Sequence, residues 1–298
     1  VKREGMETVK YLLPVRLGEC SHESVALRDE ICYFKIGITY TNPVITFSSA
    51  ADPTVIRTED GFYLYATQTD KYWVPIYFSK DLVNWEFKRT AFRNATKPQI
   101  PGGGAFWAPE IRHINGKYVL YFSWAKWGDG DASYTAVATS DSPLGDFVNS
   151  KELLTKEDFG SNCIDQFYYE EDNKKYMFVG SFNGIYVTEL TDDGLSVKRN
   201  ENGTPTLKKQ VCGKAFEGTN IYKKNGYYYL FASINNCCDG ERSRYKVVVG
   251  RSQDLLGPYL DKSGKDMINN AWELVLEGDG QKFFGPGHNS IIVQDDAG

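Results

Sequence analysis

The chain of 298 residues carries 34 Lys and Arg against 39 Asp and Glu, a formal net charge of −5. It has no basic stretch that could follow a phosphate backbone, which argues against a nucleic-acid partner. It also has no run of 18 apolar residues, so no transmembrane segment is predicted. With 20 Tyr, 17 Phe and 28 Gly, the composition favours strands and turns, and we expect a mostly β protein.

Residues 1–41 show neither a repeat nor a clear hydrophobic period. The longest apolar run at the start of the chain has about four residues, which is too short for the apolar region of a signal peptide. We therefore treat residues 1–41 as an N-terminal appendage of unclear structure. Residues 42–298 form a separate, regular unit.

A segment that repeats four times organises this regular unit. Each copy runs from an opening residue through a short apolar stretch and a turn into a Tyr-rich strand. The copies begin at Asp52, Trp107, Asp165 and Glu217. A Tyr follows each opening residue after 11 positions, as the differences 63−52, 118−107, 176−165 and 228−217 show. A third strand is visible in each copy, at residues 75–79, 135–140, 184–190 and 247–252.

Units of four short strands that recur about every 50 to 70 residues are typical of the blades of a β-propeller. A fifth unit begins at His288, and the sequence stops at Gly298, at its first turn. The sequence therefore predicts an all-β, five-bladed β-propeller over residues 42–298. We expect its fifth blade to be truncated, so that the domain is incomplete at the C-terminus.

Three of the four opening residues are acidic, namely Asp52, Asp165 and Glu217. Equal offsets in equal repeats predict equal places in the fold, so a radial arrangement would bring the three acids together near the axis. Like charges at close range repel and raise one another's pKa values. Because such a cluster is costly, it indicates a functional site.

The order and spacing of six motifs resemble glycoside hydrolase family 43, and most closely its endo-1,5-α-L-arabinanases. The motifs are NPVITFSSAADP, GAFWAPEIRHINGKYVLYFS, SNCIDQFYYEEDNKKYMFVGSFNGI, FEGTNIYKKNGYYYLFASINNCC, YKVVVGRSQDLLGPYLDK and FGPGHNSIIVQDDAG. The resemblance covers residues 42–298. It implies an inverting glycoside hydrolase that cleaves α-1,5-L-arabinofuranosidic linkages in arabinan by general acid–base catalysis.

The resemblance also implies a role for each acid. Asp52 matches the general base, Glu217 the general acid, and Asp165 the residue that raises the pKa of the acid and orients it. Inversion requires one carboxylate that activates water and one carboxylic acid that protonates the leaving oxygen, roughly 6.5–9.5 Å apart. Blades that face one another across a narrow axis can provide that separation, and this chemistry needs no cofactor.

Aromatic residues beside the acids are candidate sugar contacts. Trp107 opens the second copy, where its ring could stack on a sugar or be buried as part of a blade. Phe106 and Trp127 are candidate rim contacts with weaker support. Glu110 stands where the family usually has Asp, and we assign it no catalytic role.

His288 opens the fifth unit. The resemblance implies a histidine on the axis that helps to hold a Ca²⁺ ion, largely through water. Calcium prefers oxygen ligands, so a neutral His288 that is hydrogen-bonded within the central channel is the alternative. The neighbours Cys237 and Cys238 fall in an arabinanase-like loop. Because adjacent cysteines seldom pair, we expect both to be thiols.

Two departures from the family pattern leave the exact linkage open: Ala51 where many relatives have His, and Gln166 where Pro is usual. The alternatives are an exo-acting α-L-arabinofuranosidase or β-xylosidase of the same family, and a propeller lectin that binds sugar without cutting it. Retention of three mutually repelling acids argues against the lectin. The expected partner is arabinan or its oligosaccharides, and we expect a monomer. A polymeric substrate further predicts a secreted, periplasmic or cell-surface protein of a bacterium.

Overall fold

The computed structural model describes residues 27–28, 31–32, 42–98 and 104–292. Strands and turns make up almost all of this part of the chain, because its one α-helix, α1 (Lys156–Phe159), has four residues. Three 3-10 turns add Gly130–Ala132, Gly240–Arg242 and Met267–Asn269. No helix within these ranges is long and apolar enough to cross a membrane. Of the predicted appendage, only β1 (Leu27–Arg28) and β2 (Ile31–Cys32) lie among the described residues.

Four antiparallel sheets of four strands follow one another along the chain, and in each the strands are neighbours in chain order. Blade 1 contains β3 (Thr54–Arg57), β4 (Phe62–Tyr65), β5 (Trp73–Ser79) and β6 (Glu86–Phe92). Blade 2 contains β7 (Ala105–Ile114), β8 (Lys117–Ala125), β9 (Tyr134–Ser140) and β10 (Val148–Leu154). Blade 3 contains β11 (Phe167–Glu171), β12 (Lys174–Val179), β13 (Ile185–Leu190) and β14 (Lys209–Cys212). Blade 4 contains β15 (Glu217–Lys224), β16 (Tyr227–Ile234), β17 (Lys246–Ser252) and β18 (Glu273–Leu276).

Tight turns join the first two strands of blades 2, 3 and 4. These turns are Asn115–Gly116, Asp172–Asn173 and Asn225–Gly226, and all six residues have a left-handed φ. Two successive residues of this kind form the turn whose twist matches a pair of antiparallel strands, and Asn, Asp and Gly adopt it most readily. The local sequence therefore explains the hairpins, and the predicted third strands are confirmed as β5, β9, β13 and β17.

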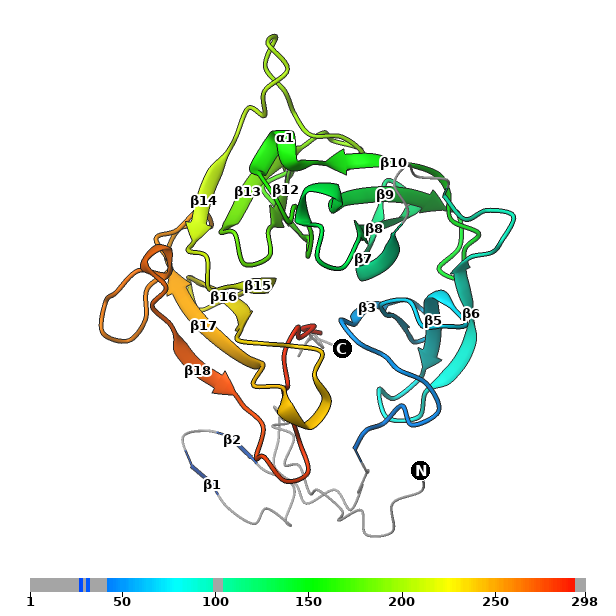
Figure 1. Ribbon diagram of the computed structural model, residues 1–298, viewed down its shortest axis with the longest axis horizontal. Helices are drawn as coiled ribbons and strands as arrows, with labels where there is room; N and C mark the ends of the chain where they lie inside the picture. Colours follow the sequence, from blue (N-terminus) through cyan, green and yellow to red (C-terminus); the bar gives the residue numbers. More distant parts are fainter. Residues whose placement is uncertain (1–26, 29–30, 33–41, 99–103, 293–298) are drawn as a thin grey trace.

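The four blades are arranged around a central axis, with β3, β7 and β15 beside it and β6, β10, β14 and β18 toward the rim (Figure 1). Apolar side chains fill the interfaces between successive blades. Between blades 1 and 2, for example, the ring of Phe106 stacks on Phe92 with centroids 5.0 Å apart and packs beside Phe122. Burial of such aromatic area fixes the blades relative to one another, and hence the loops around the axis.

The predicted propeller is confirmed, but the described residues form four blades and not five. Residues 288–292, which were expected to begin a first strand, form no strand. A strand exists through its ladder to a neighbour, and in the described part of the chain no strand forms a ladder with these residues, although His288 contacts Ser233 of β16. The rest of the expected strand and turn, residues 293–298, lies outside the described residues.

Candidate active site

A residue with left-handed backbone marks the start of each repeat at the axis. The five residues are Asp52 (φ 50°), Ala108 (φ 40°), Asp165 (φ 60°), Gly218 (φ 60°) and His288 (φ 46°). L-residues other than Gly rarely adopt this conformation, and it persists where surrounding contacts enforce it, often at functional sites. Asp52, Asp165 and His288 therefore occupy equivalent places in their repeats.

Glu217 and Trp107 come one residue before the left-handed position, so the prediction of strictly equal places was wrong by one residue in blades 2 and 4. Each of the two pairs with a Ser on the second strand of its blade, Ser233 and Ser123, just before a shift in strand register. The constant spacing of 11 to a Tyr misaligned the repeats for two reasons. In blade 3, Tyr176 lies one position further along its strand than the Tyr residues of blades 2 and 4. In blade 1, the loop between the first two strands spans residues 58–61 and is longer than the two-residue turns of the other blades. The acids nevertheless meet, since repulsion from Asp165 contributes to the raised pKa of Glu217 and repulsion from Asp52 to that of Asp165.

Hydrogen bonds tie the left-handed residues to the preceding blade. The backbone N–H of Ala108 donates to Thr67 Oγ1 at 2.8 Å, that of Asp165 to Ser123 Oγ at 3.0 Å, and that of His288 to Ser233 Oγ at 2.8 Å. Each acceptor is a hydroxyl on or just after the second strand of the earlier blade. The same backbone-to-hydroxyl hydrogen bond therefore occurs at the starts of blades 2 and 3 and again at His288, after blade 4.

Glu217 is buried, with 8% of its surface exposed, and both of its carboxylate oxygens accept hydrogen bonds. The hydroxyl of Ser181 donates to Oε2 at 2.7 Å, and that of Tyr245 donates to Oε1 at 2.5 Å. Burial, followed by repulsion from Asp165, raises the pKa of Glu217 to about 7, against the lowering effect of these two donors. A carboxyl group of this kind holds a proton near neutral pH and can deliver it.

Asp165 is buried as well, and it interacts electrostatically with both Asp52 and Glu217. Burial and then repulsion from Asp52 raise its pKa to about 8, while a hydrogen bond from the backbone N–H of Gly218 opposes the shift. Gly218 suits this left-handed position (φ 60°), because a Cβ there would lie 3.1 Å from the ring of His288, which is a tight contact. Asp165, Gly218 and His288 are therefore in one cluster beside Glu217.

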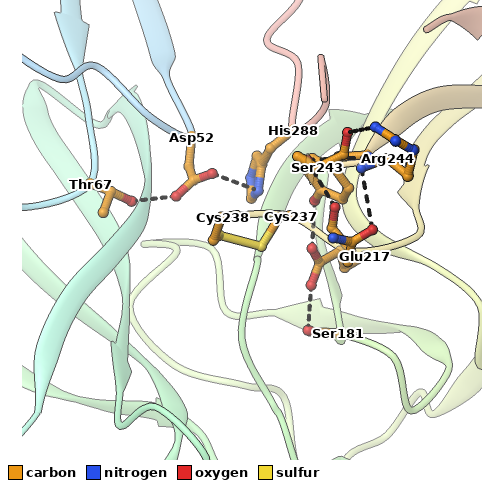
Figure 2. The surroundings of a disulfide bond; sticks show 11 residues. Asp52, Thr67, Ser181, Glu217, Cys237, Cys238, Ser243, Arg244 and His288 are labelled. Carbon is orange, nitrogen blue, oxygen red and sulfur yellow. Dashed lines mark hydrogen bonds and ion pairs between the residues drawn. A yellow bond between two sulfur atoms is a disulfide. The ribbon is translucent and has the colours of Figure 1, made fainter. Parts of the chain in front are cut away.

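Asp52 is the most open of the three acids, with 29% of its side chain exposed. Oδ2 accepts a hydrogen bond from the Thr67 hydroxyl at 2.6 Å, and Oδ1 lies 3.4 Å from Nδ1 of His288 (Figure 2). Thr67 also accepts from the N–H of Ala108, so its hydroxyl hydrogen is directed to Asp52. The carboxylate of Asp52 is thus fixed in orientation and remains accessible to water.

The structure places the three predicted acids in one cluster at the axis. The candidate sugar contacts Trp107 and Phe106 differ in their exposure to solvent. Trp107 is partly buried beside the site, and its ring meets the exposed ring of Trp127 edge-on at 5.9 Å. Phe106 is 1% exposed and packed between blades 1 and 2. The candidate role of Phe106 as a sugar contact is therefore wrong, because no face of its ring reaches the surface.

Two residues beside the site were not singled out from the sequence as partners of the acids. Tyr245 lies on the approach to β17, where no repeat signature marks it, and it holds Glu217. Glu110 is buried, accepts from the Thr54 hydroxyl at 2.9 Å and from the backbone N–H of Tyr168 at 3.2 Å, and pairs with Arg112. Glu110 thus joins blades 1, 2 and 3 through its carboxylate.

The expectation of free thiols at Cys237 and Cys238 is wrong, because the two residues form a disulfide. Cys238 has a left-handed backbone (φ 66°) within the loop that joins β16 to β17. The chain reverses direction there, which lets the side chains of neighbouring residues face one another. Figure 2 shows Asp52, Glu217 and His288 in the surroundings of this disulfide.

The surroundings of His288 do not form a calcium cage. Calcium takes six to eight oxygen ligands, and the described residues contain no group of three or more His, Cys, Asp or Glu that could hold a metal ion. The ring of His288 contacts Asp52 instead, and its backbone is engaged by Ser233. The side chains that the structure describes around His288 therefore do not fit an ion held by protein ligands alone.

Comparison with known proteins identifies similar chains. Residues 40–298 match the family Glycosyl hydrolases family 43. The chain is 30% identical to extracellular endo-α-(1→5)-L-arabinanase 1 of Bacillus subtilis, over 81% of this chain and 76% of that protein. It is 32% identical to extracellular exo-α-(1→5)-L-arabinofuranosidase ArbA of Cellvibrio japonicus, over 82% and 75%. The solved structure of Cellvibrio cellulosa α-L-arabinanase complexed with arabinohexaose superposes with a TM-score of 0.70 at 29% identity, covering 84% of each chain.

Proposed function

Since the chain belongs to glycosyl hydrolases family 43 and is therefore a glycoside hydrolase, we propose that it cleaves α-1,5-linked L-arabinofuranosyl chains of arabinan internally and with inversion. Similarity to arabinanases of Bacillus and Cellvibrio supports the substrate. The observation that carries the mechanism is the contrast between two carboxyl groups in one cluster. Glu217 is buried with a raised pKa, whereas Asp52 is open to water.

In this mechanism Glu217 is the general acid. Its pKa of about 7 keeps a large fraction protonated at neutral pH, so it can protonate the glycosidic oxygen as the bond to the sugar breaks. The two hydrogen bonds from Ser181 and Tyr245 then stabilise the carboxylate that remains. They also fix the orientation of the carboxyl group before the reaction.

Asp52 is the general base. The Thr67 hydroxyl holds one carboxylate oxygen, and the other can accept a proton from the water that attacks the anomeric carbon. Asp165 acts on the acid, because repulsion between the two carboxyl groups, when both are ionised, adds to the rise in the pKa of Glu217. In this proposal Asp165 touches no reacting atom, and it is a positioning and tuning residue. Trp107 remains the candidate stacking contact for a sugar ring.

The experiment is hydrolysis of linear arabinan by the purified protein, with products separated by chromatography over time. Endo action releases a series of arabino-oligosaccharides from the start, whereas exo action releases one product length. Exo action is the second candidate, because one of the similar proteins is an exo-α-(1→5)-L-arabinofuranosidase. Glu217→Gln is the matched inactive control, since it keeps the size of the side chain. Cleavage of xylo-oligosaccharides with no action on arabinan would contradict the proposed substrate.

We propose further that the complete ring has five blades. His288 repeats both features of the other blade starts, the left-handed φ and the N–H donated to a hydroxyl of the preceding blade. Strand β18 supports a further element beside blade 4, because Leu274, Val275 and Leu276 are 44%, 47% and 52% exposed. Three consecutive exposed apolar residues are unusual on a surface that contacts only solvent. A crystal structure with a fifth sheet between blades 4 and 1 is the expected result.

A Ca²⁺ ion near His288 stays a prediction, and no step of the mechanism depends on it. If present, it would be bound by His288 and mainly by water, since the residues that the structure describes offer no cage. Isothermal titration calorimetry with CaCl₂, with His288→Ala as the control, measures this binding.

We also propose that the protein acts outside the cell as a monomer. Two similar proteins are named extracellular, and a polymer must be cut before uptake.

A further inference from the structure

The disulfide between Cys237 and Cys238 lies in a loop that begins and ends at the catalytic cluster. The loop comprises residues 235–244 and joins β16 to β17. Just before it, Ser233 pairs with Glu217 across the strands and accepts the N–H of His288. Just after it, Tyr245 donates to Glu217. Both ends of the loop are therefore fixed by residues that contact the candidate acid or its neighbour.

Hydrogen bonds close the base of this 235–244 loop, and a 3-10 turn at Gly240–Arg242 forms part of its tip. The carbonyl of Asn236 accepts from the Ser243 hydroxyl at 2.9 Å and from the Arg244 N–H at 3.2 Å. The side chain of Asn235 donates to the Arg244 carbonyl at 3.2 Å. The two cysteines follow this neck directly, with Cys237 partly buried and Cys238 exposed. The disulfide thus stiffens the tip of a loop whose base is already rigid.

The immediate surroundings of the disulfide are polar and charged. Figure 2 draws Asp52 and Thr67 from blade 1, Ser181 and Glu217, and His288 around it. A disulfide has no hydrogen-bond donor and is a polarizable, apolar group, so it does not compete for the acids. It does offer a fixed apolar surface beside them. A furanose ring presents both hydroxyl groups and C–H groups, and ring C–H groups need an apolar contact when the sugar is bound.

We propose that the Cys237–Cys238 disulfide is a substrate contact that supports the apolar side of the arabinosyl unit bound next to Glu217. This inference rests on the proposed function. Reduction should weaken the contact. One thiolate of a dithiol attacks a cysteine sulfur, forms a mixed disulfide and releases the other cysteine as a thiolate. The second thiolate of the dithiol then attacks the dithiol's own sulfur in the mixed disulfide and releases the remaining cysteine, so the dithiol is oxidised to a cyclic disulfide and the cysteine pair is reduced to two thiols. The thiols rotate freely, and the loop tip loses the rigidity that pre-organises it for binding.

The test compares steady-state kinetics on arabinohexaose for the oxidised protein, the protein reduced with dithiothreitol, and Cys237→Ser/Cys238→Ser. Reduced protein and double variant should show KM raised about fourfold or more, the loss expected for one apolar contact of methylene size. The kcat should stay within about twofold, because the contact binds ground and transition states alike. Reoxidation should restore the wild-type protein and leave the double variant unchanged.

Controls separate this contact from other effects. Cys163 and Cys212 are buried thiols, and adding dithiothreitol to the double variant reports any other cysteine that responds. An unchanged KM overturns the inference. A lower kcat with a displaced alkaline limb of the pH profile also overturns it, since the disulfide would then act by holding Tyr245 on Glu217. Failure of the oxidised wild-type protein to cleave arabinohexaose is a different result, because it refutes the proposed function itself.

Discussion

The hydroxyl of Tyr245 donates a hydrogen bond to Oε1 of Glu217 at 2.5 Å, and both side chains are buried. This donor stabilises the carboxylate form of Glu217 and so lowers its pKa, against the larger upward effects of burial and of Asp165. The resulting pKa of about 7 reflects a balance that one hydroxyl group can alter.

Tyr245→Phe should therefore raise the pKa of Glu217 further. A general acid loses activity as pH rises through its pKa, so the alkaline limb of the kcat/KM profile should move to higher pH. Tyr228→Phe is the matched control, since its hydroxyl bonds to Glu171, away from the three acids. A limb that stays in place, or moves to lower pH, would show that Glu217 is not the group that sets it.

Asp165→Asn should stabilise the protein at high pH. The pKa of Asp165 is raised from 3.8 to about 8 in the folded protein, so the folded state holds a proton that the unfolded state releases. Ionisation therefore costs stability, beginning above pH 4 and reaching its full extent above pH 8. Asn cannot ionise, and the melting temperature of the variant at pH 9 should exceed that of wild type by about 4 °C or more.

The difference between Asp165→Asn and wild type should shrink as pH falls from 9 to 4 and vanish below the unfolded pKa of 3.8, where the wild-type carboxyl is protonated in both states. Thermal melts of both proteins between pH 9 and pH 4 measure this difference in stability. Asp172→Asn, in an exposed turn of blade 3, is the control and should show no such trend. A variant less stable than wild type at pH 9 would show that ionised Asp165 is well accommodated.

Glu110→Gln should reduce stability rather than catalysis. The carboxylate of Glu110 joins three blades and pairs with Arg112, which would lose its partner. We expect the free energy of unfolding to fall by about 2 kcal/mol, less than for a fully buried pair because Arg112 is partly exposed. Urea unfolding measures this, with the exposed Glu86→Gln as the control. A large loss of kcat in a folded variant would instead give Glu110 a catalytic role.

The sequence predicted the local features of the propeller, because hairpin turns such as Asn225–Gly226 and alternating aromatic strands are encoded within a few residues. It also predicted that Asp52, Asp165 and Glu217 meet. It misjudged their alignment, since Tyr176 lies one position further along its strand and the first hairpin loop of blade 1, residues 58–61, is longer than those of the other blades. Register depends on cross-strand pairing, which no single repeat reveals.

Contacts between segments that are distant in the sequence could not be predicted for the same reason. Glu110 finds Thr54 and Tyr168 at separations of 56 and 58 residues, across two blade junctions. Burial of Phe106 follows from packing between sheets, and its position beside Trp107 in the sequence suggested a surface role. The disulfide between Cys237 and Cys238 depends on a loop conformation that general expectations for adjacent cysteines disfavour.

Asp52→Asn should abolish activation of the attacking water while keeping the fold. We expect kcat on arabinan to fall by about 10²-fold or more, the lower range for a general base. Asp60→Asn, in the exposed turn of blade 1, should keep wild-type turnover. Near-normal turnover of Asp52→Asn would remove Asp52 from the mechanism.

The stereochemistry of the first product tests the central claim most directly. If Asp52 activates water and Glu217 protonates the leaving oxygen, water attacks from the face opposite the leaving group. Proton NMR of arabino-oligosaccharide hydrolysis, recorded before mutarotation, should then show the β-anomer appearing first from the α-linked substrate. Initial formation of the α-anomer would contradict the account, because it would mean that a carboxylate attacks the sugar and forms a covalent intermediate.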